Sequence, residues 1–151
     1  MMRFENSLIV ERPVDQVFAF IADFENMPRW NYFVLEVRKT TPGPIGLGTT
    51  FYQRRKTDEQ HYSIIEYEPD SRVTVETIPP APALRMSFTF ESVGGSTHLT
   101  DEWVVRGGII GFLGPLAAGR VKAAAAENLG KLKQLLETQE VRLQDGRSIR
   151  I

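Results

Sequence analysis

One acidic residue, Asp101, shares one face of a predicted β-strand with mostly apolar side chains. Alternate residues of a strand point to the same face, and that face carries Thr97, Leu99, Asp101, Trp103 and Val105. Burial in an apolar pocket would raise the pKa of Asp101 and suit its carboxyl group to general acid or base catalysis. The alternative is structural, with the carboxylate ordering a turn or accepting a hydrogen bond from Tyr67 or Arg55.

Tyr67 is the hydroxyl-bearing residue that would pair with Asp101 in such chemistry. It belongs to a predicted strand over 60–68, in which the adjacent Ile64 and Ile65 interrupt the alternation and Pro69 follows. We expect Tyr67 to face the interior, in a stretch where Pro69 favours a β-bulge nearby. The sequence therefore predicts Asp101 and Tyr67 as a candidate catalytic pair.

Large apolar and aromatic side chains are the candidates for the wall of a ligand site. Trp103 would stack on a planar ligand, and Trp30 combines a wide apolar body with a polar tip that suits an amphipathic molecule. Ordinary core packing is the alternative for these residues, because such side chains dominate protein cores in any case. The full candidate set is Trp30, Phe33, Phe51, Tyr67, Leu84, Met86, Phe88, Leu99, Asp101, Trp103, Phe112, Leu113 and Leu116.

Metal and cofactor sites have little support in the sequence. The chain has two histidines, His61 and His98, and no cysteine. Neither histidine has the helical spacing of a zinc pair or an evident carboxylate partner. We expect structural or surface roles for both, no metal and no cofactor, and the missing cysteines exclude disulfides and thiol catalysis.

The segment 107–114 alternates glycines with large apolar residues just before a predicted helix. One hypothesis is a mobile gate in which Phe112 and Leu113 cover the mouth of a pocket and touch a membrane or a carrier. The alternative is a tight connection whose apolar residues pack under the start of the helix.

The composition is that of one ordinary globular domain. The 151 residues include 18 basic and 19 acidic side chains, for a net charge of −1. A balance so close to neutral gives no electrostatic signature of nucleic-acid binding. No apolar run approaches the roughly 18 residues of a membrane-spanning helix, and the N-terminus lacks the pattern of a signal peptide. We expect one domain over 1–138, a tail over 139–151, and a cytoplasmic location.

Hydrophobic periodicity predicts an α+β fold. A strand over 4–10 precedes a helix over 14–22 and a short helix over 24–27, which Pro28 should end. Turn residues separate six more strands, at 34–40, 49–56, 60–68, 72–78, 84–91 and 97–106. A helical period returns from Pro115 for about 22 residues. The tail has Asp145-Gly146 at its centre and forms a small hairpin or is disordered.

The short turns predict one antiparallel sheet of seven strands around the long C-terminal helix. Large side chains dominate the inward face of the sheet, whereas the helix contributes many alanines, among them 123–126. A twisted sheet curling around such a helix would leave space that alanine does not fill. Inward polar groups, which are Asn6, Asp101 and either Gln53 or Arg55, would direct a ligand there. The alternative is that bulky neighbours close the space.

A series of short motifs covers residues 3–138 in one order. They are LIVERPVDQVF (8–18), DFENMPRW (23–30), GLGTTF (46–51), EYEP (66–69) with Arg72, GGSTHLT (94–100) and NLGKLKQLLE (128–137). This ordered set resembles the START-like SRPBCC superfamily, in its polyketide cyclase/dehydrase and lipid transport family with the Bet v 1-like helix-grip fold. The resemblance implies a sheet wrapped around the C-terminal helix and a pocket for a hydrophobic ligand. The cyclases resemble one another in a pocket arginine, where this chain has Tyr67.

Three functional hypotheses follow, because one fold hosts unrelated functions. The first is binding of a small hydrophobic or amphipathic molecule, such as a lipid or a polyketide, in a cavity between sheet and helix. The second is a polyketide cyclase or dehydratase that uses Asp101 and Tyr67 as acid and base. The third is a protein-interaction module with a filled core. A homodimer stays open, and we expect neither a nucleic-acid partner nor an integral membrane segment.

Overall fold

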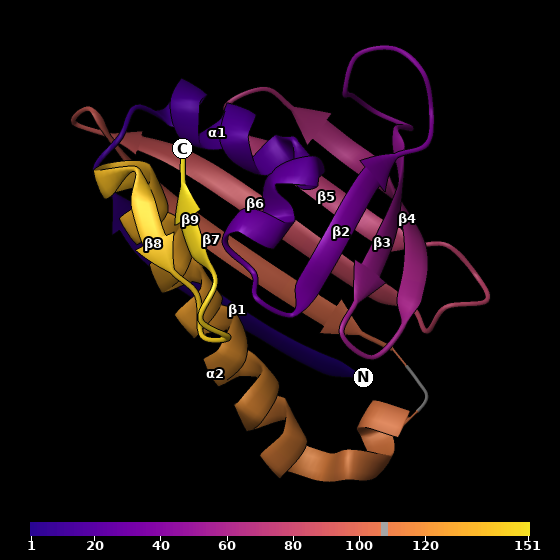
Figure 1. Ribbon diagram of the computed structural model, residues 1–151. Helices are drawn as coiled ribbons and strands as arrows, with labels where there is room; N and C mark the ends of the chain where they lie inside the picture. Colours follow the sequence, from indigo (N-terminus) through magenta and orange to yellow (C-terminus); the bar gives the residue numbers. More distant parts are fainter. Residues whose placement is uncertain (107–108) are drawn as a thin grey trace.

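The computed structural model describes the backbone of residues 1–106 and 109–151 and the side chains of 1–106 and 119–151. A seven-stranded antiparallel sheet and a long C-terminal helix form the main body (Figure 1). Two short helices, α1 (Val14–Ala22) and η1 (Phe24–Arg29), join the first two strands, and α2 (Ile109–Thr138) follows the seventh. The strands are β1 (Met2–Val10), β2 (Val34–Lys39), β3 (Thr50–Arg55), β4 (Glu59–Glu68), β5 (Arg72–Thr77), β6 (Leu84–Val93) and β7 (Ser96–Val105). This arrangement confirms the predicted helix-grip fold.

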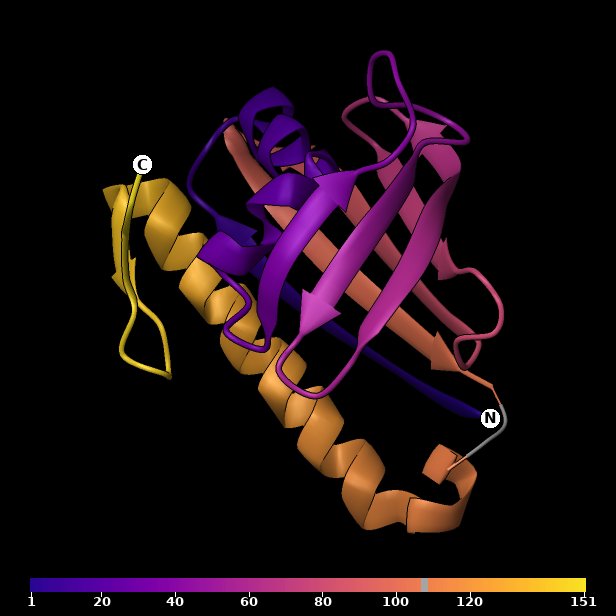
Figure 2. The ribbon, with the colours of Figure 1, turned by 45° about the vertical axis from the view of Figure 1, so that its right-hand side comes forward.

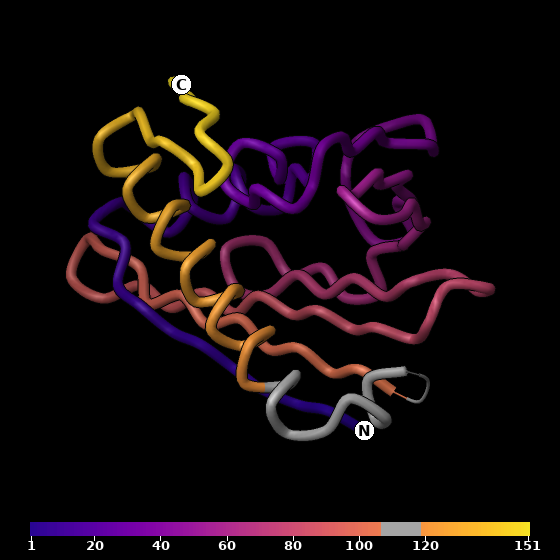
Figure 3. The backbone as a smooth tube through the Cα atoms, turned by 60° about the horizontal axis from the view of Figure 1, so that its bottom comes forward, coloured from indigo at the N-terminus to yellow at the C-terminus, as the bar shows by residue number. Residues whose placement is uncertain are grey.

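The sheet order is β1-β7-β6-β5-β4-β3-β2, so consecutive strands from β2 to β7 are neighbours and β1 pairs with β7. Short connections favour this antiparallel pairing. The sheet curls strongly, which brings β2 and β3 round towards the side that carries α2 (Figure 3). A register shift between Ile64 and Glu66 marks a bulge in β4, at the point where the two adjacent isoleucines interrupt the alternation.

The short helices begin where the sequence predicts. Pro13 occupies the N-cap position of α1, and the Asp23 side chain accepts a hydrogen bond from the Glu25 amide at the start of η1. The prediction that helical structure ends before Pro28 is wrong, because η1 is a 3₁₀ helix that continues to Arg29. The amides of Trp30 and Asn31 both donate to the Met27 carbonyl, at 3.1 and 2.9 Å, so the turn closes without an amide hydrogen on Pro28.

Helix α2 begins at Ile109, earlier than the predicted start at Pro115. Glycine and proline have low helix propensity, which is a weak guide near a helix end. The predicted gate residues Phe112 and Leu113, and the candidate Leu116, lie outside the described side chains, and Gly107 and Gly108 lie outside the described backbone. None of the described helices combines the length and the apolar character needed to cross a membrane.

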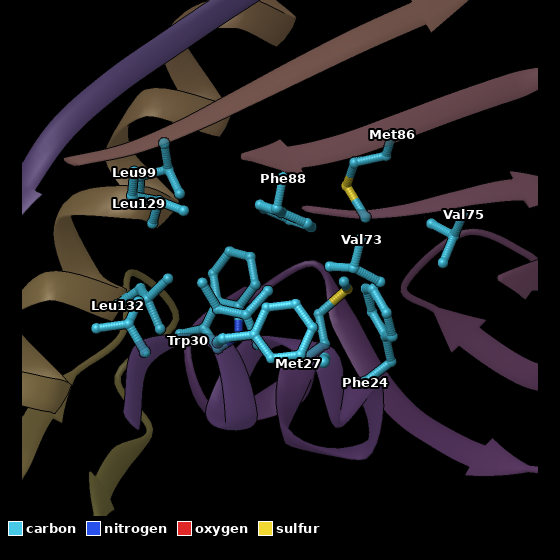
Figure 4. Packing of buried hydrophobic residues seen from close by; sticks show 14 of the residues in the cluster. Phe24, Met27, Trp30, Val73, Val75, Met86, Phe88, Leu99, Leu129 and Leu132 are labelled. Carbon is cyan, nitrogen blue, oxygen red and sulfur yellow. The ribbon is translucent and has the colours of Figure 1, made fainter. Parts of the chain in front are cut away.

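The later half of α2 packs into the hydrophobic core. Leu129 and Leu132 are at most 1% exposed, and Leu129 lies beside Leu99 of the sheet (Figure 4). Met27 and Trp30 reach the same core from η1, facing Phe88 and Val73 in Figure 4. Full burial of such a side chain contributes about 1.5–3 kcal/mol. This end of the molecule is solidly filled.

The tail forms a second, two-stranded sheet from β8 (Glu140–Arg142) and β9 (Ser148–Arg150). Gly146 has a φ of 93° in the turn, which favours glycine. The hairpin lies beside α2 (Figure 2) and buries Val141 and Leu143 in the main core cluster. The tail is therefore packed against the body of the protein.

Candidate functional site

A cavity of about 450 Å³ lies between the sheet and residues 120–128 of α2. Its lining comes from all seven strands, at the starts of β1, β2, β4 and β6 and at the ends of β3, β5 and β7. The cavity is therefore at one end of the curled sheet, and the filled core around Leu132 is at the other. Its volume is within the range of ordinary small-molecule sites.

The residues of α2 explain why one end is hollow. Ala124 and Ala125 line the cavity, whereas Leu129 and Leu132, one and two turns further along, fill the core. An alanine side chain does not reach the sheet across a distance that leucine spans. Asn128 lies at the boundary, where its Oδ1 accepts a hydrogen bond of 3.0 Å from Gln144 of the tail.

Most of the cavity wall is apolar. Trp103 stacks on Phe4 with ring centroids 5.8 Å apart, and Phe33, Leu84 and Met86 also line the cavity. Met2 and Met27 also line it. Methionine side chains adapt to ligands of different shape, so this wall suits a mainly apolar molecule.

A few polar side chains interrupt this wall. Gln53 of β3 and Gln60 of β4 are directly opposite in the register, and both are buried. Tyr62 is also buried, and burial raises the pKa of its phenol, which is therefore protonated at neutral pH. The Gln53 Oε1 and Tyr62 hydroxyl oxygen atoms are buried without a hydrogen-bond partner in the described part of the chain.

The charged residues of the described lining are two arginines. Arg55 makes a bidentate pair with Asp58, at 2.7 and 2.6 Å, so its charge is already matched. Arg120 is exposed on α2. The described lining contains no aspartate, glutamate or histidine.

Asp101 is 2% exposed, and each of its carboxylate oxygens accepts a hydrogen bond. The backbone amide of Asn6 donates to Oδ1 at 3.0 Å, and the Trp103 indole nitrogen donates to Oδ2 at 3.0 Å. Desolvation raises the pKa of this carboxyl group, and the two hydrogen bonds oppose the rise. Asp101 is not among the described lining residues, so it supports Trp103 from outside the cavity.

Tyr67 and Asp101 lie on one row across the sheet but do not meet. Tyr67 pairs with Val73, Val73 with Phe88, and Phe88 with Asp101. Three strand spacings separate Tyr67 from Asp101 by roughly 14 Å. The Tyr67 ring instead packs edge-on against Phe18 of α1, with centroids 5.5 Å apart. The structure does not bring the candidate catalytic pair together.

The other candidates with described side chains line the cavity or belong to the core cluster, and Met86 does both. Phe33, Leu84, Met86 and Trp103 line the cavity. The core cluster contains Trp30, Phe51, Phe88 and Leu99. Of the inward polar candidates, both Gln53 and Arg55 line the cavity.

Sequence reasoning missed Gln60, Tyr62, Asn31 and Asn128 as lining residues. The signal for two of them was present, because Gln60, Tyr62 and Ile64 alternate along one strand. His61 is exposed and His98 is half-buried. The described residues contain no cluster of acidic residues and histidines able to hold a metal ion.

The chain was compared with known proteins. Residues 1–137 match the family described as polyketide cyclase / dehydrase and lipid transport. No curated protein sequence matches the chain.

Many solved structures share the fold. CalU16 from Micromonospora echinospora is 18% identical with a TM-score of 0.65, and the match covers 89% of this chain and 75% of CalU16. MLL2253 from Mesorhizobium loti is 14% identical with a TM-score of 0.71, covering 92% and 99%. The di-domain ARO/CYC StfQ from the steffimycin biosynthetic pathway is 17% identical with a TM-score of 0.67, covering 89% of this chain and 44% of StfQ. At identities this low, the structural similarity shows a common fold and no more.

Proposed function

This chain belongs to the polyketide cyclase / dehydrase and lipid transport family, and on that premise we propose that it binds a small, mainly apolar molecule in the cavity beside Ala124 and Ala125. The observation that carries the proposal is the change of side-chain size along α2. Alanines face the space at one end, and leucines fill it at the other. Burial of about 300 Å² of apolar ligand surface would contribute on the order of 7 kcal/mol before the cost of association.

The polar groups favour binding over acid–base catalysis. General bases and acids are most often histidine or carboxylate side chains. The described lining has neither, and both oxygens of Asp101 are engaged by Asn6 and Trp103. The lining instead offers neutral amides and a protonated phenol, which orient a ligand through hydrogen bonds.

A matched pair of substitutions in α2 tests the proposal. Ala125 lines the cavity and is 6% exposed, whereas the next residue, Ala126, is exposed on the helix surface. Ala125→Trp should fill the cavity, and Ala126→Trp should leave it open. The probe is the amphipathic anionic dye 1-anilinonaphthalene-8-sulfonate, whose fluorescence rises when its aromatic rings leave water.

We expect the wild-type protein and Ala126→Trp to bind the dye with similar affinity. The affinity of Ala125→Trp for the dye should be at least tenfold lower. Circular dichroism and thermal unfolding check that both variants are folded. Native mass spectrometry of the purified wild-type protein would also show any molecule carried from the expression host. Equal dye binding by the two variants would contradict the assignment of this cavity as the binding site.

A further inference from the structure

Two residues that line the cavity each carry a buried polar atom that lacks a partner in the described part of the chain. These atoms are Oε1 of Gln53 and the hydroxyl oxygen of Tyr62, whose residues are 5% and 3% exposed. A buried polar atom without a hydrogen bond costs free energy, so such atoms are uncommon in folded proteins. The third such atom, Oε1 of Gln144, belongs to the tail and is not in the described lining.

The strand register brings these two side chains to one place. Gln53 is opposite Gln60, and Phe51 is opposite Tyr62, so Tyr62 is the diagonal neighbour of Gln53 on the inward face. Diagonal neighbours on adjacent strands are about 7–8 Å apart at Cα, within reach of long side chains. The last torsion of a glutamine is soft, so its amide oxygen can rotate at little cost to meet a ligand.

The chemistry of the two atoms defines the group that fits them. The amide oxygen of Gln53 only accepts a hydrogen bond, and the protonated phenol of Tyr62 both donates and accepts. A hydroxyl group donates to the first and accepts from the second. An ether or a ketone only accepts, and an ammonium group only donates. The described lining contains two arginines and no carboxylate, so it would repel a cationic group.

We infer that the molecule held in this cavity carries an uncharged hydroxyl group at its buried end, bound between Gln53 and Tyr62. The inference depends on the proposed binding function and narrows its ligand class to apolar molecules bearing such a hydroxyl. A plain hydrocarbon would fill the same space and leave both polar atoms unpaired.

Three related probes separate these possibilities. They are 2-naphthol, which donates and accepts, 2-methoxynaphthalene, which only accepts, and naphthalene, which does neither. Equilibrium dialysis measures the affinity of each. We expect 2-naphthol to bind about tenfold more tightly than 2-methoxynaphthalene, and naphthalene to bind most weakly. 2-Methoxynaphthalene is the largest of the three and buries the most apolar surface, so tighter binding of 2-naphthol would show that size does not explain the order.

Two substitutions then assign the hydrogen bonds. Gln53→Leu removes the acceptor and should bring the affinity ratio of 2-naphthol to 2-methoxynaphthalene close to one. Tyr62→Phe removes the donor and should weaken both oxygen-bearing probes relative to naphthalene. The control is Tyr52→Phe, because the Tyr52 hydroxyl donates to Glu59 on the other face of the sheet at 2.6 Å. This control should leave all three affinities unchanged.

Each contrary result points to a different failure. Equal affinity of wild-type protein for 2-naphthol and 2-methoxynaphthalene overturns the hydroxyl inference and leaves the binding function standing. A tenfold preference that survives in Gln53→Leu overturns the role of that residue. If none of the probes binds while the dye binds, the ligand class is wrong. If the dye also fails to bind, the proposed function fails with it. The wild-type affinity ratio decides the inference even where a variant does not fold.

Discussion

The indole nitrogen of Trp103 donates a 3.0 Å hydrogen bond to Oδ2 of Asp101, two residues earlier on the same face of β7. The other carboxylate oxygen accepts from the Asn6 amide of β1, so the carboxylate links the two strands and the indole ring. On its other side the ring stacks on Phe4. Asp101 is therefore a positioning residue for a wall of the cavity.

The buried carboxylate of Asp101 should make stability depend on pH. Desolvation raises its pKa in the folded protein, so its contribution to stability is fully present below the unfolded pKa of about 3.9 and is lost as pH rises through the folded pKa. An asparagine does not titrate. We therefore expect Asp101→Asn to gain stability relative to wild type as the pH is raised from 3 to 7, measured by urea unfolding. A difference that stays constant over this range would contradict the raised pKa.

The unpaired hydroxyl of Tyr62 should contribute nothing to stability. Because the oxygen is buried without a partner, Tyr62→Phe should leave the free energy of unfolding unchanged within about 0.5 kcal/mol, or raise it. The contrast is Thr77→Val in the same cavity wall. The Thr77 hydroxyl donates to the Pro82 carbonyl at 2.8 Å and accepts from the Leu84 amide at 2.9 Å, so its loss should cost about 1–3 kcal/mol. A similar loss in both variants would show that Tyr62 has a hydrogen-bond partner.

Glu137 should stabilise the end of α2 at neutral pH. Burial alone would raise its pKa, but hydrogen bonds from the Glu11 amide and from Lys133 outweigh burial and lower the pKa. A lowered folded pKa gives stability that is present above the unfolded pKa and lost as pH falls through the folded one. We expect Glu137→Gln to lower the free energy of unfolding by about 1 kcal/mol at pH 7. This difference from wild type should vanish as the pH falls below about 4. Glu127→Gln, at an exposed position of the same helix, should show neither effect in chemical unfolding.

The C-terminal hairpin should be a structural part of the fold. Leu143 precedes its turn and is 2% exposed within the main core cluster. Leu143→Ala should therefore lower the free energy of unfolding by about 2–5 kcal/mol, measured by thermal or urea denaturation. Leu47, which is 74% exposed, provides the control, and Leu47→Ala should change stability by no more than about 0.5 kcal/mol. If Leu143→Ala changed the free energy of unfolding as little as Leu47→Ala does, the hairpin would not stabilise the rest of the fold.

Local patterns predicted most of the fold. Leu84, Met86, Phe88 and Phe90 alternate along β6, which favours one inward face, and Met86, Phe88 and Phe90 are buried there. Helix ends were less predictable, since α2 begins at Ile109 and η1 continues past Pro28. These boundaries depend on hydrogen bonds such as those to the Met27 carbonyl, which residue propensity does not encode.

The sequence by itself determined which residues face inward, because the direction of a side chain follows from the local period of a strand or helix. Only the tertiary structure decided which inward residues share a site. The register places Tyr62 diagonal to Gln53, and it separates Tyr67 from Asp101 by three strand spacings. The turn and the hydrophobic pattern set the register of a single hairpin such as β3–β4, but the curl of the sheet and the relation between strands further apart depend on packing between distant segments.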